Sequence, residues 1–444
     1  MKKIYYGQQT QKAIKNFPFS VYKVHKEFIF ALVKIKKAAA VANYAAGDLS
    51  RDVKIAITKA CRRVLAGGYK DQFPLKALQG GAGTSTNMNV NEVLAAMATE
   101  ILEKNGKKII VHPNDHVNRS QSTNDVNPSA IKLASIKLVQ DLQIVLQNLA
   151  NAFEAKGNSY KDVVKLGRTH LQDAVPITVR SEFNSYAGII KWHQKKIDRV
   201  VEYCQELSLG GTAVGNSINS DPKYMREVYK ELNKITKQKF RPAENLMSQT
   251  SSQTDFLAIS QAVTALTLDT SKIASDFRLM ASGPNGGLGE ITLAELQKGS
   301  SIMPGKINPV LPETVNQLYY LISGNNITIE HAAHAAQMEL GVMFPTIADR
   351  LLQSLRITAE VLEQFSARCV ATLKVNRKRC KELLEKSTAY ATLLTPTLGY
   401  DAVSNAVKES VKTQKTLRQV LIEKKLITNE EFDVVIGRFR KSKV

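Results

Sequence analysis

Residues 131–153 read IKLASIKLVQDLQIVLQNLANAF, and their apolar side chains recur mostly at intervals of three or four residues. Leu142, Val145, Leu146 and Leu149 follow this spacing, which places them on one face of a helix. No proline interrupts the run. The stretch therefore predicts a long helix with one apolar face.

Residues 183–207 and 256–280 show the same period and also lack an internal proline, which is typical of a bundle of extended helices. The last stretch, 376–444, has shorter periodic runs and predicts a small separate unit. We expect an all-α, mainly helical fold with a central long-helix bundle, and functional side chains in its loops. The candidate loops are rich in Gly, Ser, Thr, Asn and Pro: 79–91, 112–125, 167–178, 209–219 and 283–309.

The chain has 444 residues and a formal net charge of +21, from 61 Lys and Arg against 40 Asp and Glu. These basic residues are spread along the whole chain and do not gather in one stripe with interleaved aromatic residues. Such a distribution argues against nucleic acid as a partner. The positive charge instead fits either a lysine-rich proteome or weak attraction of a small dianionic substrate.

Four scattered cysteines, none in a CxxC pair, are typical of free thiols in a reducing compartment. The first residues contain no apolar segment of the kind found in signal peptides. The most apolar early stretch, 28–42, is interrupted by Lys34, Lys36 and Lys37, and no segment approaches bilayer-spanning length. We therefore expect a cytoplasmic protein that does not bind membranes.

The richest candidate loop is 299–309, which reads GSSIMPGKINP. Its two glycines allow backbone N–H groups to approach a ligand closely. Ser300 and Ser301 supply hydroxyls, Lys306 an ammonium and Asn308 an amide, a set that suits an anionic substrate. Taken alone, the same composition also describes an ordinary flexible loop.

A second glycine-rich loop, 80–89, reads GGAGTSTNMN. It resembles a phosphate-binding loop but lacks the GKS or GKT ending and does not follow an apolar strand, so nucleotide binding is not favoured. Its hydroxyls, amides and N–H groups precede a helix expected near Val90 and could bind a carboxylate there. The alternative is a simple turn with a helix cap.

Two loops contain histidines. His112 and His116 are four residues apart, but Pro113 argues against a continuous helix, and no third ligand follows at metal spacing, so a metal site is not expected. Ser122, Thr123 and Asn124, further along that loop, could form a polar site, cap the next helix, or do both. His170, in the loop 167–176, is a candidate acid, base or carboxylate partner, or a loop histidine held by its neighbours.

Together, these segments resemble the signature regions of the aspartase/fumarase superfamily, over essentially the whole chain. Residues 299–309 match its GSSxMPxKxNP signature at every fixed position. Four other regions match in the expected order: 83–89, 120–125, 167–170 and 209–215. The resemblance implies a three-domain subunit, divided here into an N-terminal helical domain 1–122, the central long-helix bundle 123–375 and a C-terminal helical domain 376–444.

Several local choices resemble the aspartase branch, which reversibly eliminates ammonia from L-aspartate to give fumarate. They are Ala82, Thr123, residues 170–172, residues 293–297 and residues 337–340. The alternative is fumarate hydratase on the same fold, since a few side chains can decide the substrate. A more distant alternative is a non-catalytic, basic binding protein.

The resemblance also implies roles for individual residues. Ser300 would be the catalytic base, acting as an alkoxide stabilised by loop N–H groups and Lys306. The expected ligands of the β-carboxylate are Thr84, Ser122, Thr123 and Ser301. Lys306 and Asn308 would hold the α-carboxylate, while contacts to the amino group or the α-carboxylate are expected from Asn124, Thr169 and His170. The superfamily implies a homotetramer whose sites each draw loops from three subunits, without cofactor or catalytic metal.

Overall fold

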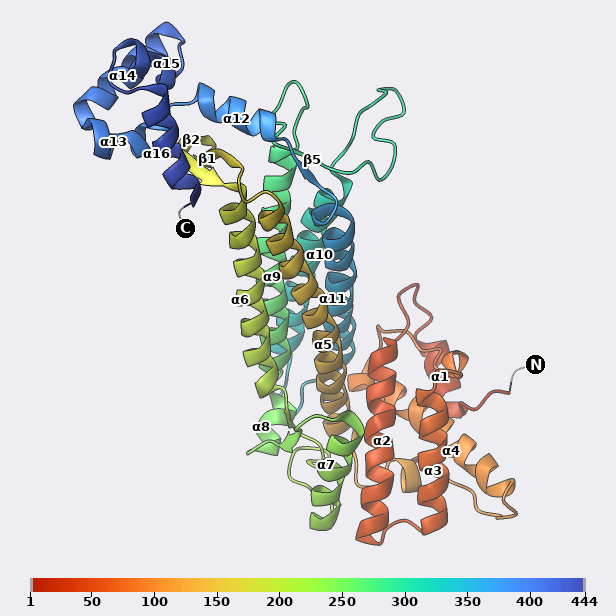
Figure 1. The fold of residues 1–444 in the computed structure, drawn as a ribbon. Coiled ribbons are helices and arrows are strands. Elements are labelled where there is room, and N and C mark those ends of the chain that lie inside the picture. The colour runs from red at the N-terminus through yellow and green to blue at the C-terminus, as the bar shows by residue number, and fades with distance from the viewer. Residues whose placement is uncertain (1–2, 442–444) are drawn as a thin grey trace. The chain divides into compact units, whose positions relative to one another are not determined.

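A computed structural model describes residues 3–441 and consists mainly of helices, which confirms the predicted fold class (Figure 1). Its longest helices are α5 (Thr123–Ser159), α6 (Val179–Tyr203), α9 (Thr254–Met280), α10 (Val310–His334) and α11 (Phe344–Phe365). The three helices expected from periodicity correspond to α5, α6 and α9. None of the helices within residues 3–441 has both the length and the apolar character needed to cross a bilayer.

The chain forms two compact units that alternate along the sequence. Unit 1 comprises residues 1–143, 195–265 and 320–359, and unit 2 comprises residues 144–194, 266–319 and 360–444. Each of the five long helices has residues in both units. The division into domains 1–122, 123–375 and 376–444 stays a prediction from the family resemblance.

Unit 1 is built around α2 (Lys26–Ala46), which packs against α3 (Arg51–Leu65), α4 (Thr84–Glu103) and α7 (Pro222–Thr236). The His25 ring accepts the N–H of Glu27 where α2 begins, and Gly47, at φ +95°, ends the helix. The glycine in left-handed conformation is a preferred helix end, and the His25 ring satisfies one of the free N–H groups of the first turn. The remaining elements of unit 1 are short: α1 (Gln8–Asn16), α8 (Leu246–Ser251), β3 (Glu206–Leu207), β4 (Arg241–Pro242), and the single turns Lys70–Gln72, Gly81–Gly83 and Pro113–Val117.

An aromatic core joins α5, α6, α9 and α11 inside unit 2, where Figure 1 shows these helices side by side. The ring of Phe153 lies 5.6 Å from Tyr186 and 6.3 Å from Phe277. Phe183 and Phe365 complete the group. Such tilted and edge-to-face pairs contribute about 1 kcal/mol each beyond the burial of their area.

Unit 2 also contains an antiparallel hairpin, β1 (Val164–Thr169) with β2 (Gln172–Thr178). The interpretation of 167–178 as a loop was therefore wrong. Leu166 of β1 packs with Leu384, Leu417 and Phe432 in a second apolar core, which buries one face of the hairpin. This core is formed largely by α12 (Arg377–Lys386), α13 (Ala391–Leu398), α14 (Tyr400–Thr413), α15 (Leu417–Glu423) and α16 (Asn429–Lys441), while β5 (Ile291–Thr292), β6 (Lys374–Val375) and the turn Ser366–Val370 complete unit 2.

Candidate active site

Three of the predicted loops meet within unit 1. Residues 118–125 are the end of the predicted loop 112–125 and the first turn of α5, and are called the 118–125 loop below. Thr123 Oγ1 accepts a hydrogen bond from Asn87 Nδ2 at 3.2 Å, which joins the 118–125 loop to the start of α4. Asn124 Nδ2 donates to the carbonyl of Ala213 at 2.8 Å, which joins it to the 209–215 loop. Ser122 Oγ accepts the N–H of Asn124 at 3.2 Å. The hydroxyls and the amide expected to bind substrate are therefore held by neighbouring segments and remain half-buried.

Asp125 is the centre of this junction. Its side chain is fully buried, and one carboxylate oxygen accepts the N–H of Ser122 at 2.9 Å. The other accepts the N–H groups of Gly210 and Thr212, at 2.9 and 3.1 Å. Burial raises the pKa of Asp125 to about 6, although the three N–H groups oppose the shift. One carboxylate thus ties two site-bearing loops together.

Lys36 projects from α2 into the same junction and is fully buried. Its Nζ donates to Asn118 Oδ1 at 2.8 Å and Gln121 Oε1 at 3.0 Å. Burial lowers the pKa of Lys36 to about 7, and the charge of Asp125 partly opposes this shift. In the sequence, Lys36 is only one of three lysines that interrupt the apolar run 28–42. A lysine within so apolar a run was the signal that could have identified it.

The glycine-rich loop is held by Asn127 of α5. Asn127 Nδ2 donates to the carbonyl of Ala82 at 2.8 Å. A Cβ on Gly83, which has φ +82°, would lie 2.7 Å from that nitrogen, so only glycine fits here. Thr84 follows as the first residue of α4; it is exposed, and its Oγ1 donates to the carbonyl of Gly81 at 2.7 Å.

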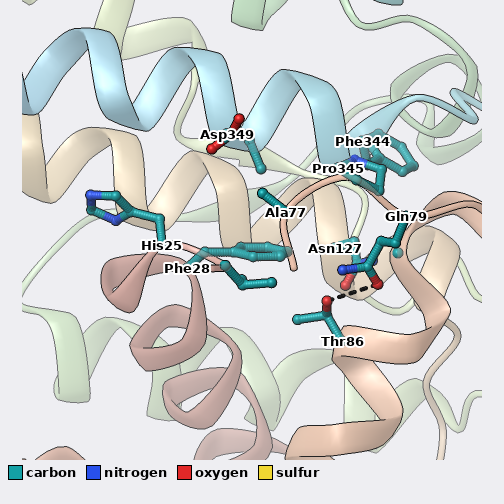
Figure 2. A pocket seen from close by; sticks show the side chains of 12 residues that line it. His25, Phe28, Ala77, Gln79, Thr86, Asn127, Phe344, Pro345 and Asp349 are labelled. Atoms are coloured by element: carbon teal, nitrogen blue, oxygen red, sulfur yellow. Dashed lines mark hydrogen bonds between the residues drawn. The ribbon is translucent and has the colours of Figure 1, made fainter. Parts of the chain in front are cut away.

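Figure 2 shows the packing behind this loop. Thr86 Oγ1 donates to Gln79 Oε1 at 3.0 Å, and Asn127 lies beside them. Phe28 and Phe344 lie against the same space, so the loop has a partly apolar support. The loop is therefore a preorganised turn that presents Thr84 at its surface.

Residues 293–309, which follow β5 in unit 2 and end the predicted loop 283–309, are called the 293–309 loop. This loop carries the predicted base, Ser300. Ser300 Oγ accepts two backbone N–H groups, from Ile302 at 3.2 Å and Met303 at 3.1 Å. Donors aimed at one oxygen stabilise negative charge on it. The same local contacts also occur in ordinary serine turns, and the role of Ser300 as the base stays a prediction.

The same loop closes on itself. Asn308 Nδ2 donates to the carbonyl of Gly299 at 2.6 Å. A Cβ on Gly299 would lie 1.8 Å from the carbonyl oxygen of Lys306, so the backbone can approach itself this closely only at a glycine. Ser301 and Lys306 are exposed. Lys306 and Asn308 line a cavity of about 780 Å³, whose wall also includes Arg278, Arg379 and Glu313.

Thr169 and His170 lie at the tip of the β1–β2 hairpin and are exposed. Thr169 pairs with Gln172, so His170 and Leu171 form a two-residue turn with φ of 56° and 60°. Positive φ at both positions matches the twist of a tight hairpin, although it is uncommon in residues other than glycine. The tight turn therefore places the exposed His170 at the tip of the hairpin, on a backbone with positive φ.

The histidine pair His112 and His116 has a local structural role. The backbone N–H of His112 donates to His116 Nδ1 at 2.7 Å, and His112 Nδ1 lies 2.9 Å from a carboxylate oxygen of Asp115. These contacts close the single helical turn Pro113–Val117. Across residues 3–441, no three His, Cys, Asp or Glu side chains are grouped as a metal site requires.

The predicted site residues thus form two groups. Those of unit 1 are Thr84, Ser122, Thr123 and Asn124. Those of unit 2 are Thr169, His170, Ser300, Ser301, Lys306 and Asn308. Their individual roles stay predictions. The buried residues Lys36 and Asp125, which support the first group, were not predicted from the sequence.

Family models match most of the chain. A model described as lyase matches residues 2–324, and one described as fumarase C C-terminus matches residues 391–437. Aspartate ammonia-lyase of Bacillus subtilis is 41% identical over 99% of this chain and 93% of its own length. The class II fumarate hydratase of Helicobacter pylori is 39% identical over 97% of this chain and 93% of its own length.

Solved structures agree with these matches. The cobalt-bound fumarate lyase:delta crystallin of Brucella melitensis is 38% identical, with a TM-score of 0.94, covering 99% of this chain and 96% of that one. Class II fumarase of Schistosoma mansoni is 34% identical, with a TM-score of 0.91, covering 98% and 95%. From its loops, its fold and these relatives, the chain belongs to the aspartase/fumarase superfamily of lyases.

Proposed function

We propose that this protein is an aspartate ammonia-lyase, which converts L-aspartate reversibly to fumarate and ammonia with Ser300 as the general base. The observation that carries the proposal is the pair of N–H groups, from Ile302 and Met303, that face Ser300 Oγ. A free serine hydroxyl is too weak a base for a C–H proton. Two donors on its oxygen lower the cost of the alkoxide.

The reaction proceeds in two balanced steps. The Ser300 alkoxide takes a proton from Cβ of aspartate and becomes the hydroxyl, and the electron pair of the broken C–H bond moves into the adjacent carboxylate as an aci-carboxylate. That pair then returns to form the Cα–Cβ double bond, while the C–N bond of the protonated amine breaks and its electron pair leaves with NH3. Because negative charge builds up on the β-carboxylate, donors at that group provide most of the stabilisation.

The 118–125 loop supplies donors of this kind. The hydroxyls of Ser122 and Thr123 are held in place by the bonds described above, so little reorganisation is needed when charge develops. Thr84 and Ser301 complete the proposed β-carboxylate site. Lys306 and Asn308 bind the α-carboxylate, and Asn124, Thr169 and His170 contact that group or the amine.

Ammonia is favoured over water as the leaving group for two reasons. Ala82 and Thr123 are the choices typical of the aspartase branch. The Bacillus subtilis relative named aspartate ammonia-lyase is also 41% identical. Fumarate hydratase is the second candidate, because the Helicobacter pylori relative with that name is 39% identical.

Assembly completes the proposal. The superfamily resemblance implies a homotetramer in which each site combines loops from three subunits, and we propose this assembly here. We further propose a cytoplasmic location. Sedimentation or light scattering of the purified protein tests the tetramer, and a stable, fully active monomer would refute shared sites.

The function is tested by incubating purified protein with L-aspartate and, separately, with L-malate, while fumarate is followed by its ultraviolet absorbance. Fumarate from aspartate alone supports the proposal. Fumarate from malate alone assigns the protein to fumarate hydratase. If neither substrate reacts, and fumarate with ammonium yields no aspartate, the lyase proposal fails.

A further inference from the structure

Four charged side chains of unit 2, two of them buried and two half-buried, form a cluster beneath the β1–β2 hairpin. Lys165 Nζ lies 2.9 and 3.0 Å from the two carboxylate oxygens of Glu182, and 3.0 Å from Glu290 Oε2. Arg168 Nη1 donates to Glu290 Oε1 at 2.9 Å. Two cations and two carboxylates thus balance, and Glu290 is shared between both cations.

Stability alone does not explain this cluster. The side chains of Lys165 and Glu290 are 4% and 1% exposed, so both have lost nearly all their hydration. Desolvation of buried ions consumes most of the energy gained by pairing them, and apolar residues of equal volume often stabilise a protein as well or better. What an ion cluster adds is a defined geometry between the segments that carry its members.

Arg168 and Glu290 lie on segments that lead into the proposed active-site residues. Arg168 directly precedes Thr169 and His170, and Glu290 precedes the 293–309 loop. Glu290 is itself anchored, since its N–H donates to Met280 O and its carbonyl accepts from Asn376, both at 2.8 Å.

The hairpin needs such an anchor. Its pairing register shifts between Leu166 and Arg168, so the strand ladder is irregular just below the tip. The bond from Arg168 to Glu290 lies at this irregularity. It fixes the direction in which the tip leaves the sheet.

We propose that Arg168 and Glu290 are positioning residues, which hold the Thr169–His170 tip in register with the base of the 293–309 loop. Neither residue is proposed to touch the substrate. Because it assigns these segments to the active site, the inference rests on the proposed function. The cluster acts by orientation, so its loss should impair substrate handling in addition to the destabilisation expected when a buried charge loses a partner.

The kinetic test uses Arg168→Met, Arg168→Lys and Glu290→Gln in the full-length protein. We expect Arg168→Met and Glu290→Gln to lower kcat/KM for the turned-over substrate on the order of tenfold or more. Arg168→Lys should recover part of this loss, because the charge remains but the planar fork does not. The double variant Arg168→Met/Glu290→Gln should cost no more than the worse single change.

The matched control is Arg377→Met. Arg377 pairs with Asp162 in the same unit, but neither residue adjoins a predicted site residue. This variant should keep kcat and KM within about twofold of wild type. If the cluster variants behave like this control, while only their unfolding midpoint falls, the cluster is purely structural and the proposal is overturned.

A second readout does not need activity. Amide hydrogen exchange, followed by mass spectrometry, should speed up at residues 166–173 in Glu290→Gln, although Glu290 lies far away in the sequence. Unchanged exchange there would overturn the proposal. Wild-type protein without lyase activity would instead refute the proposed function. The exchange result would still decide whether Glu290 holds the tip of the hairpin.

Discussion

The 118–125 loop and the 293–309 loop both carry predicted site residues, but their surroundings differ. Helix α2 holds the first through Lys36 and Asn43, while Asn87 and the 209–215 loop hold it from other directions. The second makes its described side-chain hydrogen bonds at Ser300 and Asn308 within itself, and residues 301–307 are exposed.

The two loops are therefore suited to different tasks. A site that must receive a developing charge benefits from donors that are already in place. A segment that must admit substrate and then exclude water benefits from few external bonds, since such segments open at low cost in free energy. Perturbing the first loop should therefore affect stability, and perturbing the second should affect catalysis alone.

The largest effect is expected from Ser300→Ala. Loss of the base should lower kcat by about a thousandfold or more. The unfolding midpoint should stay at the wild-type value, because the hydroxyl is bonded only within its loop. Steady-state kinetics and thermal unfolding measure the two quantities, with Ser159→Ala as the control. Near-normal turnover would remove Ser300 from the role of base.

Asp125→Ala should produce the opposite pattern. Three buried N–H groups lose their acceptor, which should lower the free energy of unfolding by roughly 3 kcal/mol. Urea unfolding measures this loss, and Asp141→Ala, at an exposed position of α5, is the control. A loss no larger than that of the control would show that the junction is not what holds the 118–125 loop.

Lys36→Met tests the same junction through pH. Lys36 has a pKa of about 7 in the folded state and the ordinary value of 10.5 when unfolded, so the folded protein loses stability as pH falls from 10.5 towards 7. Between about pH 7 and about pH 9 the wild-type free energy of unfolding should therefore gain up to about 1.4 kcal/mol per pH unit from this group. Lys36→Met should lack that contribution.

Urea unfolding at several pH values compares Lys36→Met with wild type and with Lys59→Met, an exposed lysine on α3. The difference between wild type and Lys36→Met should grow with pH in favour of wild type. The control should follow the wild-type slope. A constant difference across this range would contradict the assigned pKa shift.

The smallest effect is expected from Gly305→Ala. Gly305 has φ +79°, and a Cβ there meets no atom within 4 Å, so the change adds about 1 kcal/mol of backbone strain and no clash. The strain should lower kcat a few-fold without changing the unfolding midpoint. Gly68→Ala, at an open position without positive φ, is the control. A fall in the midpoint would mean that the loop supports the fold.

The long helices followed from sequence because one apolar face repeats along them, as in α5 and α9. The hairpin did not, because β1 buries the four consecutive residues 164–167 and so shows no alternation of buried and exposed positions. Its buried lysine, Lys165, is stable only beside Glu182 and Glu290. The residues next to Lys165 in the sequence do not indicate that Glu182 and Glu290 are its partners.

The sequence by itself determined the helical class, the superfamily and the residues expected at the site, since periodicity and motifs are properties of the chain order. Only the tertiary structure decided which groups support them. It paired Lys36 with Asn118, tied Asp125 to Gly210, and joined Arg168 to Glu290. These pairings depend on segments far apart in sequence, because burial makes each polar group require a partner wherever the fold brings one.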